Sequence, residues 1–228
     1  MKFIHVAVAV LSLLSVGQSA PVSSCESLIQ PLEINGREQL LGTWTHIAEA
    51  TNVPLSKFLT DLLLESSRVK VTAANESDTM NLFLSQKSLG RCFSFTYKAT
   101  LEQNTLTSAH PLPLSAALLS TGCSDCNVFY TNFTIGGRTF NSVQLTSRRD
   151  KVAAAELEEF TKQVECLNLP APAIMDPEKG FCSDEVTDLT QFLTDMGSDV
   201  QRLLDGIINS LGRIQTLGEA GSKSQDDV

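Results

Sequence analysis

The chain has 228 residues, six cysteines and a formal net charge of −9 at pH 7. Its length fits one domain, or one domain with a tail. The acidic balance argues against nucleic acid and anionic membrane surfaces as partners, because both attract basic proteins.

Residues 1–20 contain one lysine, then an apolar run over residues 3–16, then small residues. This pattern predicts a secretory signal peptide. The run is shorter than the roughly 20 residues of a membrane span, and no later stretch qualifies, so we expect a secreted protein without a transmembrane segment. Six cysteines in an oxidising compartment predict three disulfides. Sequons at Asn75 and Asn132 predict N-glycosylation of the secreted chain.

Short segments with alternating apolar residues dominate the middle of the chain, and helical spacing interrupts them only over residues 53–65. The pair Gly136-Gly137 predicts a tight hairpin between the last two segments. The predicted strands cover residues 42–50, 66–74, 79–86, 91–102, 104–110, 114–121, 127–135 and 139–148. About eight short strands with tight connections predict a closed antiparallel barrel or a sandwich.

Two helical patterns follow the strands. Residues 151–167 have an apolar stripe at helical spacing, and a helix that follows the last strand must pack on the outside of the sheet. After a Pro-rich connector, apolar residues recur at three- and four-residue steps from Val186 to Ile214, which predicts an amphipathic helix of about eight turns. The last residues, 219–228, are predicted to be disordered.

The tail has three interpretations. It docks on its own barrel, it binds a lipoprotein or a partner protein, or it covers the mouth of the barrel. Its basic residues are few, so attraction to anionic lipid is not expected.

Three motifs in chain order carry a resemblance to a known family. Gly42-Thr43-Trp44 is similar to the G-x-W motif that opens the first strand of lipocalins. Ser124-Asp125-Cys126 lies where that family has T-D-Y, with a cysteine in place of the tyrosine. Arg148, which we prefer to its neighbour Arg149, resembles the family's arginine that packs across the tryptophan. With this order and strand count, the chain resembles a lipocalin.

The resemblance implies a mainly β fold, an eight-stranded antiparallel up-and-down barrel with a C-terminal α-helix packed outside and an additional amphipathic helical tail. In this interpretation residues 1–20 are the signal peptide, residues 21–182 the lipocalin domain and residues 183–228 the tail. Trp44 and Arg148 then have a structural role, because the stacked pair closes the bottom of the barrel.

The cysteine spacing resembles the lipocalin branch that contains apolipoprotein M, alpha-1-acid glycoprotein and the saxitoxin- and tetrodotoxin-binding plasma proteins. This resemblance implies two disulfides and leaves two cysteines to pair with each other. The implied pairs are Cys25–Cys166, Cys92–Cys182 and Cys123–Cys126.

Cys123 and Cys126 also have the C-x-x-C spacing of redox and zinc motifs. Redox motifs of this kind open a helix in a βαβ unit, whereas this one opens a strand in a β-rich chain. The chain has no second pair to complete a tetrahedral zinc site. A structural disulfide is therefore the favoured interpretation, and we expect neither a metal nor a cofactor.

Side-chain alternation predicts which residues face a barrel cavity. Trp44 facing inward places His46 and Ala48 inward and Glu49 outward, and the glycosylated and disulfide-bonded positions fix the faces of other strands. The candidate ligand contacts are His46, Val69, Val71, Phe93, Phe95, Tyr97, Phe129 and Thr131. His46 either binds the polar head of a ligand, attracting an anionic group when protonated, or is satisfied by a neighbour near the tryptophan.

The resemblance and the apolar, aromatic lining together predict a secreted carrier of a small lipophilic or amphipathic molecule. One alternative is a plasma protein that binds cationic guanidinium toxins, although the predicted inward faces hold few carboxylates. Another is an interaction protein that recruits a partner through the tail. We do not expect an enzyme, because the family's prostaglandin isomerase needs a cavity cysteine that the strand 66–74 lacks.

Overall fold

The computed structural model describes residues 24–183, so the predicted signal peptide and the tail beyond Ser183 lie outside the described residues. The described chain has nine strands, three α-helices and two 3₁₀-helices. The strands are β1 (Gly42–Thr51), β2 (Leu64–Ala73), β3 (Thr79–Ser88), β4 (Arg91–Glu102), β5 (Thr105–Ser108), β6 (Leu114–Leu119), β7 (Cys126–Ile135), β8 (Arg138–Ser147) and β9 (Ala173–Ile174). The helices are α2 (Cys25–Leu28), η1 (Arg37–Leu40), α3 (Ser56–Leu63), α4 (Ala154–Cys166) and η2 (Pro177–Lys179).

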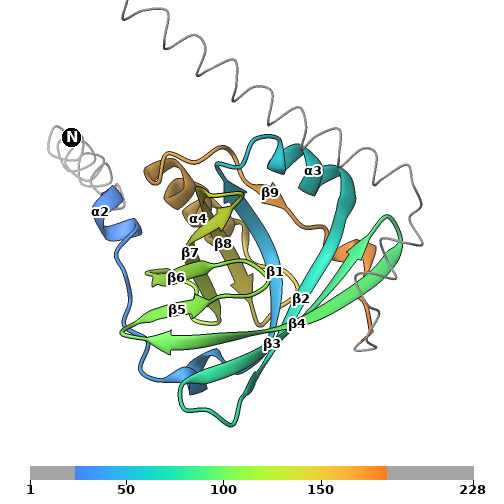
Figure 1. The fold of residues 1–228 in the computed structure, drawn as a ribbon. Coiled ribbons are helices and arrows are strands. Elements are labelled where there is room, and N and C mark those ends of the chain that lie inside the picture. The colour runs from blue at the N-terminus through green and yellow to red at the C-terminus, as the bar shows by residue number, and fades with distance from the viewer. Residues whose placement is uncertain (1–23, 184–228) are drawn as a thin grey trace, which may run out of the picture.

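The first eight strands form a closed antiparallel barrel. Each strand pairs with the next along the chain, β8 pairs with β1, and β1 also pairs with β2, which closes the sheet. Figure 1 shows α3 at one end of the barrel and the blue N-terminal segment at the other. The predicted mainly β, eight-stranded barrel is therefore confirmed, with β9 as an extra strand that the Pro-rich connector did not indicate.

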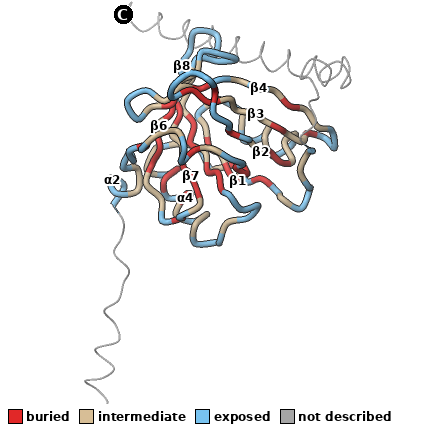
Figure 2. Tube along the Cα trace, turned by 90° about the horizontal axis from the view of Figure 1, so that it is seen from below, coloured by how far each residue is buried: buried red, intermediate tan, exposed pale blue. Residues whose placement is uncertain are grey.

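A second hydrophobic core lies outside the barrel, between the sheet and α4. Phe160 and Val164 of α4 are almost fully buried against outward side chains of β7 and β8, such as Val128, Val143 and Leu145. Figure 2 shows buried stretches along β1, β6 and β7, with exposed residues in the connecting loops. The helix thus covers the outer face of one half of the barrel, as the apolar stripe of residues 151–167 predicts.

A β-bulge in β1 changes which of its residues face inward. The register with β8 shifts between His46 and Ala48, so Ile47 and Ala48 both pack in the outer core. Beyond the bulge, Glu49 faces the barrel interior. The predicted inward position of Ala48 and outward position of Glu49 are therefore wrong, because one extra residue reverses the alternation.

Three disulfides join the cysteines in the pairs that follow from the resemblance to the lipocalin branch. They link Cys25 to Cys166, Cys92 to Cys182 and Cys123 to Cys126, and no cysteine of the chain is free. The first joins α2 to the end of α4, and the second joins the C-terminal segment to β4. Because these two crosslinks bridge residues far apart in sequence, they restrict the unfolded chain strongly.

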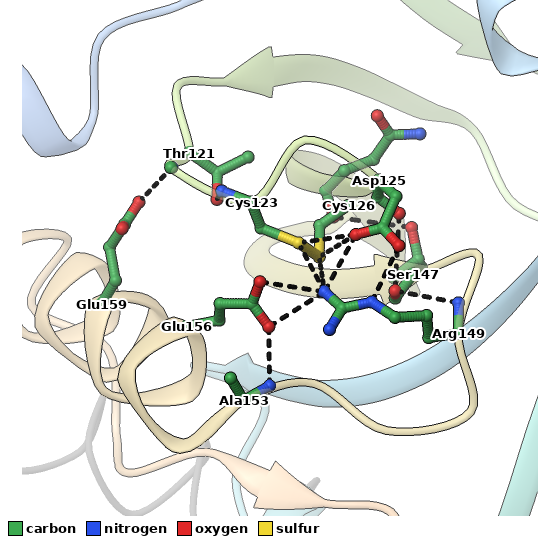
Figure 3. The surroundings of a disulfide bond; sticks show 12 residues. Thr121, Cys123, Asp125, Cys126, Ser147, Arg149, Ala153, Glu156 and Glu159 are labelled. Atoms are coloured by element: carbon green, nitrogen blue, oxygen red, sulfur yellow. Dashed lines mark hydrogen bonds and ion pairs between the residues drawn. A yellow bond between two sulfur atoms is a disulfide. The ribbon is translucent and has the colours of Figure 1, made fainter.

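The third disulfide lies beside an arginine network at the end of β8. Arg149 bonds both carboxylate oxygens of Asp125, at 2.7 and 2.9 Å, and also pairs with Glu156 at 2.9 Å (Figure 3). These contacts hold the pKa of the Glu156 carboxyl below its usual range, chiefly through the hydrogen bond from Arg149 and then that from the Ala153 amide. Asp125 and the two sulfurs form a compact group of atoms of metal-binding types, but disulfide sulfurs offer no thiolate to an ion.

Asn75 and Asn132 both lie on the outside of the barrel and are exposed. Their positions are compatible with attached glycans, and N-glycosylation at both stays a prediction. Among the described residues, the structure contains no helix with the length and apolar character needed to span a membrane.

Candidate ligand-binding cavity

The barrel encloses a cavity of about 400 Å³. This volume is within the range of small-molecule binding sites. Its walls come from strands β1 to β8, and the side chain of Leu40 from η1 contributes at the closed end. The connections β1–β2, β3–β4, β5–β6 and β7–β8 all lie at the opposite end, because the strands run up and down. We call that end the mouth.

Trp44 and Arg148 close the other end. The indole Nε1 of Trp44 donates a hydrogen bond of 2.8 Å to the carbonyl oxygen of Leu40. The Arg148 guanidinium carbon lies 3.5 Å from the centre of the Trp44 ring, an arrangement typical of a cation–π contact. The same guanidinium donates to the carbonyl oxygens of Leu41 at 2.6 Å and Thr43 at 3.2 Å. Partial burial lowers the pKa of Arg148, and the group stays charged at physiological pH.

Steric constraints explain why the first residue of the G-x-W motif is a glycine. Gly42 has a φ of 99°, a conformation that L side chains rarely adopt. A Cβ atom at this position would lie 2.6 Å from Nη1 of Arg148. The backbone of Gly42 thus leaves room for the guanidinium that covers the tryptophan.

The cavity has two chemically different faces. Strands β2 to β6 supply a mainly apolar face, whereas β1, β7 and β8 contribute most of the polar side chains. The apolar face includes Val69, Val71, Met80, Leu82, Ala99, Leu106, Leu114 and Ala116. The polar side chains of β1, β7 and β8 are Glu49, Thr51, Asn127, Thr131, Ser142, Gln144 and Thr146. A molecule with one apolar and one polar side matches this division better than a hydrocarbon does.

Glu49 is the one charged side chain among the described residues that line the cavity. Its Oε1 accepts a hydrogen bond of 2.9 Å from Thr60 Oγ1 of α3, and its Oε2 is 3.5 Å from Gln144 Nε2. Oε2 also lies 3.7 Å from Nε2 of His46. The carboxylate is only 20% exposed, so a cavity ligand meets a negative charge with few competing waters.

Tyr97 provides a hydroxyl on the apolar side of the cavity. It lies on β4, opposite Leu82 of β3. Burial raises the pKa of the Tyr97 hydroxyl above its ordinary value, so the group stays neutral and can donate or accept a hydrogen bond.

The structure brings most predicted contact residues together. Val69, Val71, Tyr97, Phe129 and Thr131 all line the cavity. They come from three different strands, β2, β4 and β7, so only barrel closure places them around one space.

Three predicted contact residues are not part of the cavity wall: His46, Phe93 and Phe95. His46 lies behind Glu49, at the bulge, and its buried Nε2 has no hydrogen-bond partner among the described residues. The two phenylalanines lie on the first half of β4, and β5 pairs with β4 only from Thr100 onward. Because β5 has four residues, the barrel wall is incomplete beside Phe93 and Phe95.

Comparison with known proteins gives a match only at the level of structure. No protein-family model and no curated protein sequence matches the chain. Among solved structures, the siderocalin Ex-FABP, described as functioning through dual ligand specificities, matches with a TM-score of 0.54 and 17% sequence identity. The match covers 60% of this chain and 93% of that chain. The chain has a lipocalin fold.

In this lipocalin fold, the residues that the sequence interpretation missed belong mainly to the polar face. Gln144, Ser142 and Thr146 alternate along β8, so the period-two pattern carried a signal for them. Glu49 had no such signal, because its inward position depends on the bulge.

Proposed function

We propose that the chain is a secreted lipocalin that binds and carries a small amphipathic molecule in its barrel cavity. The observation that supports this proposal best is the two-faced lining of the cavity, with an apolar side from β2 to β6 and polar groups on β1, β7 and β8. Burial of an apolar body contributes roughly 25 cal/mol per Å² of surface, and the polar side then fixes the orientation of the head.

The proposed role is binding and not catalysis. All six cysteines are in disulfides, which leaves no thiol for a cysteine-dependent isomerase reaction in the cavity. The disulfides and the exposed positions of both sequons also agree with a secreted glycoprotein.

The polar head is proposed to contact Glu49 and Gln144. A buried carboxylate attracts a protonated amine or accepts a hydrogen bond from a hydroxyl, and it repels a carboxylate or phosphate head. Glu49 therefore also supports a second candidate function, the binding of a cationic guanidinium compound. Guanidinium groups form strong charge-assisted hydrogen bonds to carboxylates, and Glu49 places a carboxylate at the cavity wall.

Trp44 provides a direct assay, because it is the only tryptophan and lines the closed end of the cavity. We would titrate delipidated protein with an alkylamine, an alcohol and a fatty acid of equal chain length, together with a hydrophilic guanidinium compound. Saturable changes in Trp44 emission with the amine and the alcohol, and weak binding of the fatty acid, are expected for the carrier. A response to the guanidinium compound alone would replace the first candidate with the second.

The variant Glu49→Gln separates the head contact from the apolar contribution. It should remove the preference for the amine over the alcohol while leaving alcohol binding nearly unchanged. Glu102→Gln, at the exposed last residue of β4, is the matched control because it removes the same charge outside the cavity. An unchanged amine preference in Glu49→Gln would contradict the proposed head contact.

A further inference from the structure

His46 is a buried titratable side chain to which the proposed carrier function gives no role. It lies at the bulge of β1, just beyond the last residue of β1 that pairs with β2 and just before the residues that pair with β9. Its side chain is only 12% exposed, and its Nε2 atom is buried without a hydrogen-bond partner among the described residues. Buried polar atoms of native proteins are nearly always hydrogen-bonded, so this exception needs a reason.

The carboxylate of Glu49 lies next to this nitrogen. Oε2 of Glu49 is 3.7 Å from Nε2 of His46, which is too long for a hydrogen bond but within reach of an ion pair. Thr60 holds the other oxygen, Oε1, through its 2.9 Å hydrogen bond, which keeps Oε2 on the side of His46. The contact is therefore strongly attractive only when the imidazole carries a second proton and a positive charge.

A small recess at the seam between β1 and β2 also borders His46, and its acidic member is Asp150. The other residues that line it with His46 are Thr45, Ser66, Met175, Pro177 and Phe181. Asp150 forms an ion pair with Arg68 of β2, and its side chain is 55% exposed. Because its charge is offset by a basic partner and screened by solvent, Asp150 attracts a protonated His46 only weakly.

The charge of Glu49 is available to His46. Lys57 of α3 lines a second small recess together with Glu49, but its ammonium group is paired with Asp61 of the same helix at 2.6 Å. Gln144, the neighbour from β8, is uncharged. Side-chain exposures of 12% for His46 and 20% for Glu49 leave little water to weaken an ion pair between them. A proton on His46 is thus balanced chiefly by Glu49, which is also the charge that faces the cavity.

We propose that a proton on His46 weakens the binding of a cationic head at Glu49, so that the cavity holds an amine near neutral pH and releases it in mildly acidic solution. This regulation rests on the proposed function, because it acts through the contact of the ligand head with Glu49. Imidazole changes its charge between about pH 5 and 8, whereas an alkylamine stays charged over that range. Neutral His46 leaves Glu49 its full negative charge, and protonated His46 makes the pair neutral. By linkage, binding of a cation expels the proton from His46.

The first test measures the dissociation constants of octylamine and 1-octanol from Trp44 emission, at about pH 7.5 and about pH 5.5. The constant for octylamine should be about tenfold higher at the lower pH, a usual size for coupling between two sites, and that for 1-octanol should not change. His46→Gln should bind octylamine equally at both pH values. The matched control His110→Gln, at an exposed position outside the cavity wall, should keep the tenfold change.

The outcomes of this test separate the regulation from the function on which it rests. An octylamine affinity that is the same at both pH values in the parent protein would overturn the regulation alone. A pH dependence that persists in His46→Gln would also overturn it, because the titration would then belong to Glu49 or to another group. Octylamine that binds at neither pH would overturn the proposed function and the regulation with it.

The second test needs no ligand. Urea unfolding of the parent protein, His46→Gln, Glu49→Gln and the double variant gives the coupling between the two side chains. At about pH 5.5 this coupling should favour the folded state about fivefold more, in the equilibrium constant of unfolding, than at about pH 7.5, because only the protonated imidazole forms the ion pair. The same cycle with His110→Gln in place of His46→Gln is the control and should give no coupling at either pH. Equal coupling of His46 and Glu49 at both pH values would overturn the regulation, whatever the affinity for octylamine.

Discussion

Arg148 offers the sharpest test of how the closed end of the barrel is stabilised. Replacement by alanine removes the cation stacked 3.5 Å from the Trp44 ring and the donors to the carbonyl oxygens of Leu41, Thr43 and Gln39. Replacement by lysine keeps the charge over the ring but loses the planar fork that reaches three carbonyls at once. The two variants therefore separate the stacking contact from the hydrogen bonds.

The magnitude follows from these contacts. A partly desolvated cation–π pair contributes about 1–2 kcal/mol. The 2.6 Å bond to Leu41 is the only short one, and a charged donor of this kind contributes about 1.5 kcal/mol after allowance for solvent access. The 3.2 and 3.5 Å bonds add little. We expect Arg148→Ala to lower the free energy of unfolding by about 3 kcal/mol and Arg148→Lys by about half of that.

Urea unfolding followed by Trp44 emission measures these losses, provided that the dependence on urea concentration stays the same as in the parent protein. Arg91→Ala, an exposed arginine at the other end of the barrel, is the control and should change stability little. A loss below about 0.5 kcal/mol for Arg148→Ala, the usual range for surface substitutions, would refute the reasoning. In that case the closed end is stabilised by the packing of Trp44 alone.

Three further predictions concern the frame of the barrel. Gly42→Ala should lower the thermal midpoint in a calorimetric scan, because alanine is strained at a φ of 99° and its Cβ would displace the guanidinium of Arg148. In denaturant titrations, Glu156→Gln should destabilise the protein at neutral pH but not well below pH 4. The hydrogen bond from Arg149 depresses the pKa of Glu156, so the stability that the ionised carboxylate contributes disappears as pH falls through that pKa. Replacing Cys92 and Cys182 together by serine should reduce the free energy of unfolding by about 4 kcal/mol in urea, since 90 residues separate them; a loss under 1 kcal/mol would contradict the chain-entropy argument.

Local sequence determined the elements of this protein and their class. Alternation over residues 91–102 and 127–135 defined strands, and the structure has β4 and β7 there. Gly136-Gly137 fixed a two-residue hairpin, because both glycines adopt positive φ. The apolar stripe in residues 151–167 indicated the helix that covers the barrel. Each of these signals acts within a few residues, so a single sequence is enough to detect it.

Tertiary structure alone decided the polarity of the cavity. The extra residue at the bulge in β1 is visible only in the pairing with β8, and it turns Glu49 into the barrel. The shortness of β5 leaves the first half of β4 paired with β3 alone, and Phe93 and Phe95, which lie there, are not part of the cavity wall. Side-chain periodicity is local, so it predicted the strands and the helix and left a barrel or a sandwich open, and the resemblance to lipocalins implied the barrel. The register between strands depends on partners distant in sequence, and that register decided which side chains a ligand would meet.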